Sequence, residues 1–95
     1  MVHVLVQVRV EDFDTFYSGF ESRGFPLRKR HGSRGARVFR HADALDEVSI
    51  LFEWESREGM EAFLADPEVR ESMKKGGTVG PPKITYLYRA GELDA

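Results

Sequence analysis

The amino-terminal segment alternates between apolar residues and others. Valine stands at every second position from residue 4 to residue 10, with Leu5, Gln7 and Arg9 between. Side chains of a strand point alternately to its two faces, so this period-two spacing of β-branched residues is typical of a strand. The segment is therefore predicted to be a strand with one pure valine face and one mixed face.

Helical spacing replaces this alternation after residue 12. Aromatic residues at i, i+3, i+4 and i+7, from Phe13 to Phe20, form one stripe of an amphipathic helix. Asp12 is suited to cap its first turn, because a carboxylate accepts hydrogen bonds from free backbone N–H groups. Gly24 is expected to end this helix, and Pro26 to begin a short second one.

Two further strands are predicted over residues 36–41 and 48–54, joined by a turn at residues 42–46. In the later strand the apolar side chains again recur at every second position and share one face: Val48, Ile50, Phe52 and Trp54. In the earlier strand the pattern leaves open whether Val38 or Phe39 lies on the opposite face of the sheet, away from these apolar side chains.

The last third of the chain predicts a broken helix and a final strand. Ser56 is expected to cap a helix that Asp66-Pro67 interrupts and restarts, since proline cannot continue the hydrogen-bond ladder but suits a first helical position. Gly76-Gly77 is expected to end the second piece. Residues 76–82 are interpreted as a helix stop and a flexible connector, and residues 83–89 as the last strand.

These elements follow the order β-α-β-β-α-β within one α+β domain over residues 1–95. Right-handed crossovers place such a chain in a four-stranded antiparallel sheet with its helices on one face, the ferredoxin-like arrangement. The other face stays bare, with Leu5, Leu51 and Leu87 surrounded by polar residues, as in an interface. The pattern thus predicts a homodimer formed through the open sheet face, with Arg9 and Glu53 as an ion pair on it.

Composition narrows the class of protein. The chain has 95 residues, a formal net charge of -2 and no cysteine. This charge does not favour nucleic acid or an anionic membrane as a partner, and no apolar run reaches the length of a membrane span. With no basic leader at its start, the chain is expected to be cytoplasmic. The basic run Arg28-Lys29-Arg30 is interpreted as a solvated helix face.

The whole chain resembles a known group of proteins. The resemblance rests on the element order, on Phe52-Glu53-Trp54-Glu55-Ser56, on Glu61-Ala62-Phe63-Leu64-Ala65 and on the segment from Asp66-Pro67 to Met73, with Gly80-Pro81-Pro82-Lys83-Ile84 near the end. These features resemble the dimeric α+β-barrel superfamily, and within it the small proteins related to antibiotic-biosynthesis monooxygenases and polyketide cyclases. The resemblance implies a dimeric α/β barrel.

The resemblance also bears on cofactors and catalytic residues. Relatives that oxidise polyketides without a cofactor share a tryptophan on the third strand and an asparagine four residues earlier. Here Trp54 matches the tryptophan, whereas Ile50 takes the other place and the chain has no asparagine at all. Heme-degrading relatives use a histidine on the second helix, and residues 57–75 contain none. No cofactor is therefore predicted. No two histidines have the i, i+4 spacing of a helical metal site, so no metal is predicted either.

Five residues are candidates for a site. Trp54, with Phe52 and Tyr86, is the candidate for ligand binding, and the alternative is that all three only pack the core. Tyr17 and His31 are the candidates for catalysis. His31 is suited to act as a general base near neutral pH. The alternatives are a core tyrosine whose hydroxyl reaches solvent and a histidine that interacts with free carbonyls at a helix end.

Two functions remain open from the sequence. The first is a pocket between helices and sheet that binds an aromatic or polyketide-like small molecule, with cofactor-free monooxygenase or cyclase chemistry. The second is a non-catalytic dimeric barrel protein with a stress or regulatory role. A large apolar pocket favours the first. A pocket filled by Phe16, Phe52, Phe63 and Met73 favours the second.

Overall fold

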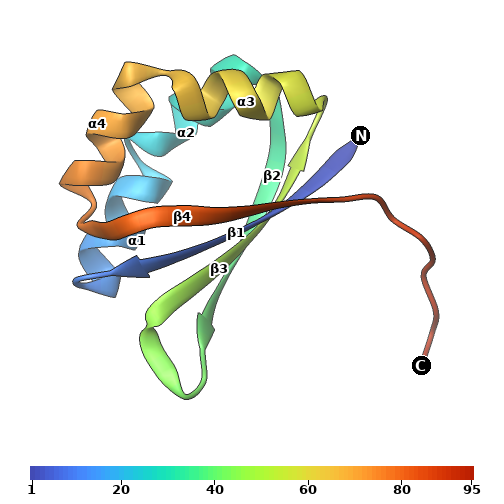
Figure 1. Cartoon of the computed structure of the whole chain (residues 1–95), viewed down its shortest axis with the longest axis horizontal. Helices are drawn as coiled ribbons and strands as arrows, with labels where there is room; N and C mark the ends of the chain where they lie inside the picture. The colour runs from blue at the N-terminus through green and yellow to red at the C-terminus, as the bar shows by residue number, and fades with distance from the viewer.

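Four strands and four helices make up the fold of residues 1–95 in the computed structural model (Figure 1). The strands form one antiparallel sheet in the order β2-β3-β1-β4, with the helices gathered on one of its faces, so the predicted ferredoxin-like α+β fold is confirmed. The elements are β1 (Val2–Val10), α1 (Phe13–Glu21), α2 (Gly24–His31), β2 (Ser33–His41), β3 (Ala44–Trp54), α3 (Arg57–Ala65), α4 (Pro67–Lys75) and β4 (Thr78–Leu87).

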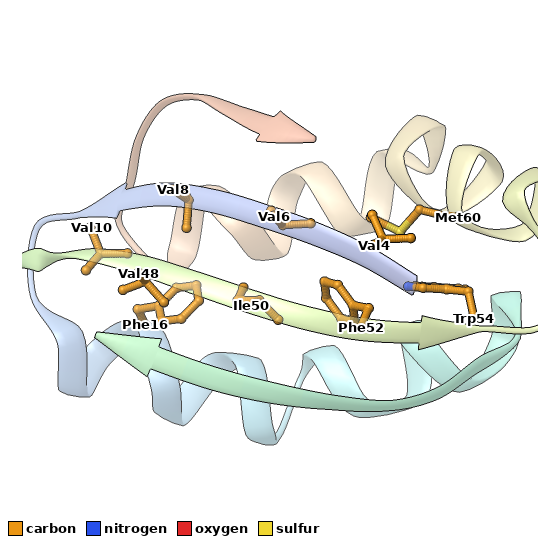
Figure 2. Packing of buried hydrophobic residues seen from close by; sticks show 10 residues of the cluster. All are labelled: Val4, Val6, Val8, Val10, Phe16, Val48, Ile50, Phe52, Trp54 and Met60. Carbon is orange, nitrogen blue, oxygen red and sulfur yellow. The ribbon is translucent and has the colours of Figure 1, made fainter. Parts of the chain in front are cut away.

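The core lies between the sheet and the helices. The valine face of β1 and the even-numbered apolar face of β3 line up in register, as Val4 with Phe52 and Val6 with Ile50. Figure 2 shows these side chains together with Phe16 from α1 and Met60 from α3. Burying this apolar surface is the main force that holds the helices on the sheet.

Short polar contacts set the helix ends. The Asp12 carboxylate accepts from the Thr15 hydroxyl at 2.8 Å and from the Thr15 N–H at 2.9 Å, and these two hydrogen bonds lower the pKa of Asp12. The Ser56 hydroxyl accepts from the Gly59 N–H at 3.0 Å, which caps α3 as predicted. Gly24 does not end the first helix: α1 stops at Glu21, and Gly24 is the first residue of α2.

Three strands begin earlier than predicted, and the last strand ends at Leu87 rather than at residue 89. β2 begins at Ser33, and β3 begins at Ala44, which pairs with His41 across a turn of two residues. Between the pairs Arg40–Val48 and His41–Ala44, residues 45–47 of β3 have no partner on β2 and form a bulge. The last strand begins at Thr78 and includes Pro81 and Pro82. It can include prolines because it is an edge strand, whose outer side has no neighbouring strand that requires backbone N–H donors.

The bare face of the sheet carries the predicted leucines. Leu5 lies directly opposite Leu51, and Leu87 opposite His3. Of the two residues left open on β2, Phe39 lies on this face and is 53% exposed, whereas Val38 packs against the core.

The predicted ion pair between Arg9 and Glu53 is wrong. Neighbouring strands run antiparallel, so the two residues lie at opposite ends of their strands. Arg9 instead lies opposite Glu47 and donates to its carboxylate at 3.1 Å, and Glu53 lies opposite His3.

Gly59 allows α2 and α3 to approach closely. A Cβ at this position would lie 2.5 Å from the carbonyl oxygen of His31, a backbone atom that has little room to move. We expect Gly59→Ala to lower the free energy of unfolding by about 1–3 kcal/mol, as overpacking does. Urea unfolding followed by circular dichroism measures this.

Gly19→Ala is the matched control for that variant. The three atoms nearest to its added Cβ would all belong to the guanidinium of Arg23, an exposed side chain that can move away. Alanine has the higher helix propensity, so Gly19→Ala should be neutral or stabilising. Equal effects of the two substitutions would contradict the close approach at Gly59.

Candidate functional site

A small apolar cavity lies between the sheet and the helices. Its volume is about 80 Å³, and twelve of its eighteen lining residues are hydrophobic. Val6, Val8, Ile50 and Phe52 form the sheet side. The helix side includes Phe16, Phe20, Leu27, Met60, Phe63, Leu64, Val69 and Met73. The cavity lies where the sequence predicts a ligand pocket, although it is far smaller than the roughly 300–1,000 Å³ of typical small-molecule sites.

Arg28 is the only charged residue in the cavity wall. Its guanidinium donates to the carbonyl oxygen of Phe20, and its Cζ atom lies 4.0 Å from the centre of the Phe20 ring. Partial burial lowers the pKa of Arg28, because removal from water disfavours the charged form.

The sequence interpretation missed Arg28 by treating the whole basic run as solvated. Arg30 does point outward and pairs with acidic side chains, whereas Arg28 turns inward. Helical spacing is the signal that indicates the inward position of Arg28. Gly24, Leu27 and Arg28 stand at i, i+3 and i+4 and so share one helix face, and the first two are buried. Gly24 also leaves room here, since a Cβ would lie 2.7 Å from Nη1 of Arg28.

Trp54 is completely buried beside the cavity. It is 0% exposed, and its ring centre lies 5.1 Å from that of Phe63 and 5.8 Å from that of Phe52. Both phenylalanines line the cavity, although Trp54 itself does not. Figure 2 shows the indole among the core side chains.

The indole N–H of Trp54 has no hydrogen-bond partner. Neither Tyr17 nor a backbone carbonyl accepts a hydrogen bond from it. A buried donor left unpaired costs roughly 1–3 kcal/mol, so such groups are rare in folded proteins. An acceptor on a bound molecule would remove that cost.

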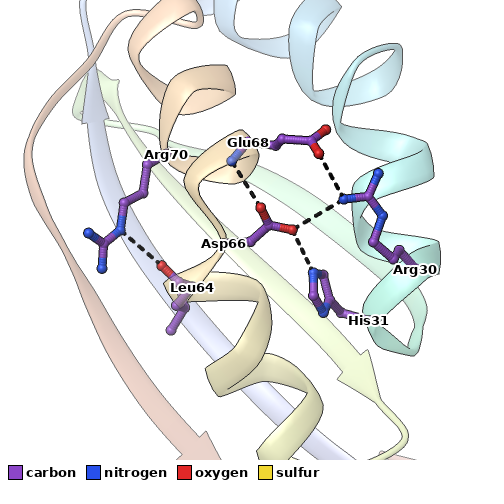
Figure 3. Close-up of polar contacts among 6 residues, drawn as sticks. All are labelled: Arg30, His31, Leu64, Asp66, Glu68 and Arg70. Carbon is purple, nitrogen blue, oxygen red and sulfur yellow. Dashed lines mark hydrogen bonds and ion pairs between the residues drawn. The ribbon is translucent and has the colours of Figure 1, made fainter.

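His31 belongs to a polar cluster on the helices rather than to the cavity wall (Figure 3). Its Nε2 atom lies 2.8 Å from Oδ2 of Asp66, and both side chains are mostly buried, at 19% and 11% exposed. A carboxylate can only accept, so Nε2 carries the hydrogen and Nδ1 of the neutral ring is the free acceptor. The ring also meets Phe63 edge-on, with centres 6.1 Å apart. One phenyl ring therefore separates His31 from the cavity.

Asp66 links three elements. Its other oxygen, Oδ1, accepts from the backbone N–H of Glu68 at 2.9 Å and caps α4, and Arg30 lies 3.4 Å from Oδ2 (Figure 3). These contacts, led by the hydrogen bond from His31, lower the pKa of Asp66 below its ordinary value of 3.8. The cluster joins α2 to the junction of α3 and α4.

The other predicted site residues lie apart. Tyr17 is 38% exposed and stacks on Phe13 with ring centres 5.6 Å apart, outside the cavity wall. Tyr86 is half-buried on β4 under the guanidinium of Arg57, and desolvation raises the pKa of its hydroxyl. The fold thus brings Phe52 and Trp54 together, holds His31 one ring away, and places Tyr17 and Tyr86 elsewhere.

The charge on Asp66 should make stability depend on pH. Because its pKa is lowered on folding, its contribution is complete above the unfolded value and is lost as pH falls through the folded one. Asp66→Asn keeps a capping oxygen but removes the charge. We expect its thermal midpoint to be a few degrees below that of the natural chain at pH 7 and to converge with it as the pH falls below the folded pKa of Asp66.

Glu68→Gln is the control for this pH profile. Glu68 pairs with the same Arg30, at 3.2 Å, but its side chain is mostly exposed, so its loss should change little. A constant difference between Asp66→Asn and the natural chain at every pH would show that the charge plays no part.

No metal or membrane element accompanies this site. Nowhere in the fold do three His, Cys, Asp or Glu side chains gather as a metal site. None of the helices combines the length and the apolarity that crossing a bilayer takes.

Solved structures share the fold over almost the whole chain. A Bordetella bronchiseptica protein named provisionally as an antibiotic biosynthesis monooxygenase has a TM-score of 0.78 at 19% identity, over 94% of this chain and 96% of its own. SnoaB from Streptomyces nogalater, a cofactor-independent oxygenase, has a TM-score of 0.77 at 15% identity, over 99% and 97%. Rv0793 from Mycobacterium tuberculosis has a TM-score of 0.66 at 17% identity, over 98% of each chain.

Comparison of the sequence finds fewer relatives than comparison of the structure. No curated protein matches the chain significantly. The family model for antibiotic biosynthesis monooxygenase matches residues 1–75, which include both central strands and most of the cavity wall. The chain therefore belongs to the antibiotic biosynthesis monooxygenase family.

Proposed function

We propose that this protein is a homodimeric, cofactor-independent oxygenase that acts on an aromatic or polyketide-like small molecule. The ligand would bind in the cavity between sheet and helices. The observation that carries this proposal is the unpaired, fully buried indole N–H of Trp54 beside an apolar cavity. A flat ligand with a carbonyl or hydroxyl oxygen would fill apolar space and accept that hydrogen bond.

The residues around the cavity suit such a ligand. Phe52 and Phe63 offer ring faces and edges to a flat molecule, and both contact Trp54. SnoaB, which shares the fold, is a cofactor-independent oxygenase. Because 15% identity carries the fold alone, its activity enters here only as part of the proposal.

His31 is the proposed base for this chemistry. Asp66 holds Nε2–H and leaves Nδ1 free to accept a proton, as a general base requires. The ring of Phe63 separates His31 from the cavity, so the proposal requires this phenylalanine to move when the ligand binds. Tyr17, on the outer side of α1, takes part in proton transfer only for a ligand that reaches that surface.

The size of the cavity favours a second candidate function. At about 80 Å³ it is too small for a fused-ring compound without side-chain movement. Phe16, Phe52, Phe63 and Met73 line it, as expected for a core that is filled rather than open. A non-catalytic dimeric protein with a stress or regulatory role fits a closed core of this kind.

Tryptophan emission and oxygen uptake decide between the two. The chain has one tryptophan, so its emission reports directly on this site. With a hydroquinone or an anthrone added in metal-free buffer, we expect saturable quenching together with oxygen consumption. His31→Gln should retain the quenching and reduce oxygen uptake by about 10²-fold or more, the usual contribution of a general base.

Filling the cavity provides the control. Ser72 lines the cavity with no side-chain hydrogen bond, so Ser72→Phe should occupy it and abolish quenching while the fold is kept. If neither compound changes the emission of the natural chain, the oxygenase proposal fails and the non-catalytic function is preferred.

The proposed dimer uses the bare face of the sheet. Leu5 and Leu51 form a cross-strand pair near its centre, and Phe39 and Leu87 add exposed apolar surface, while charged and polar residues surround them. A second copy of the same face would cover this surface by two-fold symmetry.

A further inference from the structure

Two hollows in the molecule share a wall. A surface groove of about 410 Å³ lies between α1, α2 and the edge strand β2. The interior cavity lies behind it. Phe20 and Arg28 belong to the lining of both, so these two side chains form the boundary between groove and cavity.

Arg28 has unused capacity for an anion. A guanidinium carries five N–H donors. The one hydrogen bond that the structure shows from Arg28 goes to the carbonyl oxygen of Phe20, and no carboxylate lies within ion-pair distance of it. A planar, partly desolvated guanidinium without a counter-charge is well suited to bind a carboxylate or phenolate through paired hydrogen bonds.

The groove as a whole is positive, although the chain has a net charge of -2. Its cations are Arg28, Lys29 and Arg34, and its one acidic residue is Glu21. Arg34 is the only one of these in an ion pair, with an exposed carboxylate at 3.3 Å, that of Glu55.

Aromatic side chains line the groove beside these charged residues. Phe25 on α2 is 56% exposed, and Tyr17 on α1 is also exposed. The ring of Phe20 lies at the inner end, stacked on Phe16 with centres 5.6 Å apart. Exposed rings beside cations match a ligand that is both flat and negatively charged.

We propose that the ligand of this protein is an aromatic anion, bound in the groove with its carboxylate or phenolate on Arg28 and its ring on Phe25. The ring then enters the cavity by passing between the side chains of Phe20 and Arg28, which have to move apart. Binding in the groove is supported by the residues that line the groove, whereas entry of the ring into the cavity rests on the proposed oxygenase function. The proposal makes Arg28 the residue that selects charged over neutral aromatics.

A pair of probes that differ in charge tests this selection. 2-Naphthoate and 2-naphthalenemethanol have the same ring system, and calorimetric titration measures the affinity of each. We expect naphthoate to bind about tenfold or more tightly, as one charge-assisted contact provides, and this preference to fall with added salt. Amide shifts confined to residues 17–38, which include the whole lining, should locate the site in the groove.

Variants assign the preference to Arg28. Arg28→Met keeps the apolar stem and should abolish the preference, and Arg28→Lys should retain part of it. Arg89→Met, in the exposed segment after β4, changes the net charge equally and should leave the preference intact. Phe25→Ala should lower the affinity for both probes by the same factor. This variant still tests binding in the groove if Arg28→Met does not fold.

The outcomes separate this proposal from the oxygenase function. Equal affinity for the two probes, or equal effects of Arg28→Met and Arg89→Met, would overturn the role of Arg28 even if neutral hydroquinones are oxidised. A naphthoate preference that depends on Arg28, without any change in tryptophan emission, would support the groove and reject entry into the cavity.

Discussion

Replacing Leu51 with Lys is expected to convert the proposed dimer to a monomer. Leu51 lies on the bare face of the sheet, directly opposite Leu5 on the neighbouring strand. Each leucine buried there contributes roughly 1.5–3 kcal/mol. A lysine in the middle of a two-fold interface would bring two ammonium groups together without partners, which costs several kcal/mol. Light scattering after gel filtration, at micromolar concentrations, measures the change in mass.

Leu93→Lys is the control for this variant. Leu93 is 90% exposed, in the segment that follows β4 and extends away from the helices (Figure 1). The same substitution there should leave the dimer intact. A natural chain that is already monomeric, or a Leu51→Lys variant that remains a dimer, would refute the interface on this face.

Trp54→Ala is expected to cause the largest loss of stability. The side chain is completely buried among Phe52, Phe63 and the rest of the core. Truncation of a buried aromatic residue to alanine costs about 3–5 kcal/mol, a large share of the total stability of a domain of this size. Urea unfolding followed by far-ultraviolet circular dichroism gives the difference.

Trp54→Phe separates packing from hydrogen bonding at the same position. It leaves a smaller void and removes the unpaired N–H, so its cost should be well below that of alanine. If a ligand accepts from this N–H, the phenylalanine variant should also lose most of the thermal stabilisation that the ligand provides. Stabilisation retained in full would show that the indole N–H does not touch the ligand.

Local pattern determined most of the elements. The alternating valines of β1, the aromatic stripe of α1, the caps at Asp12 and Ser56 and the helix break at Asp66-Pro67 each depend on neighbouring residues, so the sequence alone shows them. Because these elements allow few right-handed connections, the sheet and the covered face also followed. Trp54 and Phe52 were correctly placed on the covered face for the same reason.

Only the tertiary structure decided the chemistry of the site. His31 and Asp66 are 35 positions apart, and the fold alone brings them within hydrogen-bond distance. The inward turn of Arg28, the missing partner of Trp54 and the size of the cavity depend on how helices from distant parts of the chain pack on the sheet. Periodicity reports which face of an element is buried. It carries no information on which side chain of another element lies opposite, and that contact determines whether a buried polar group is paired, free or available to a ligand.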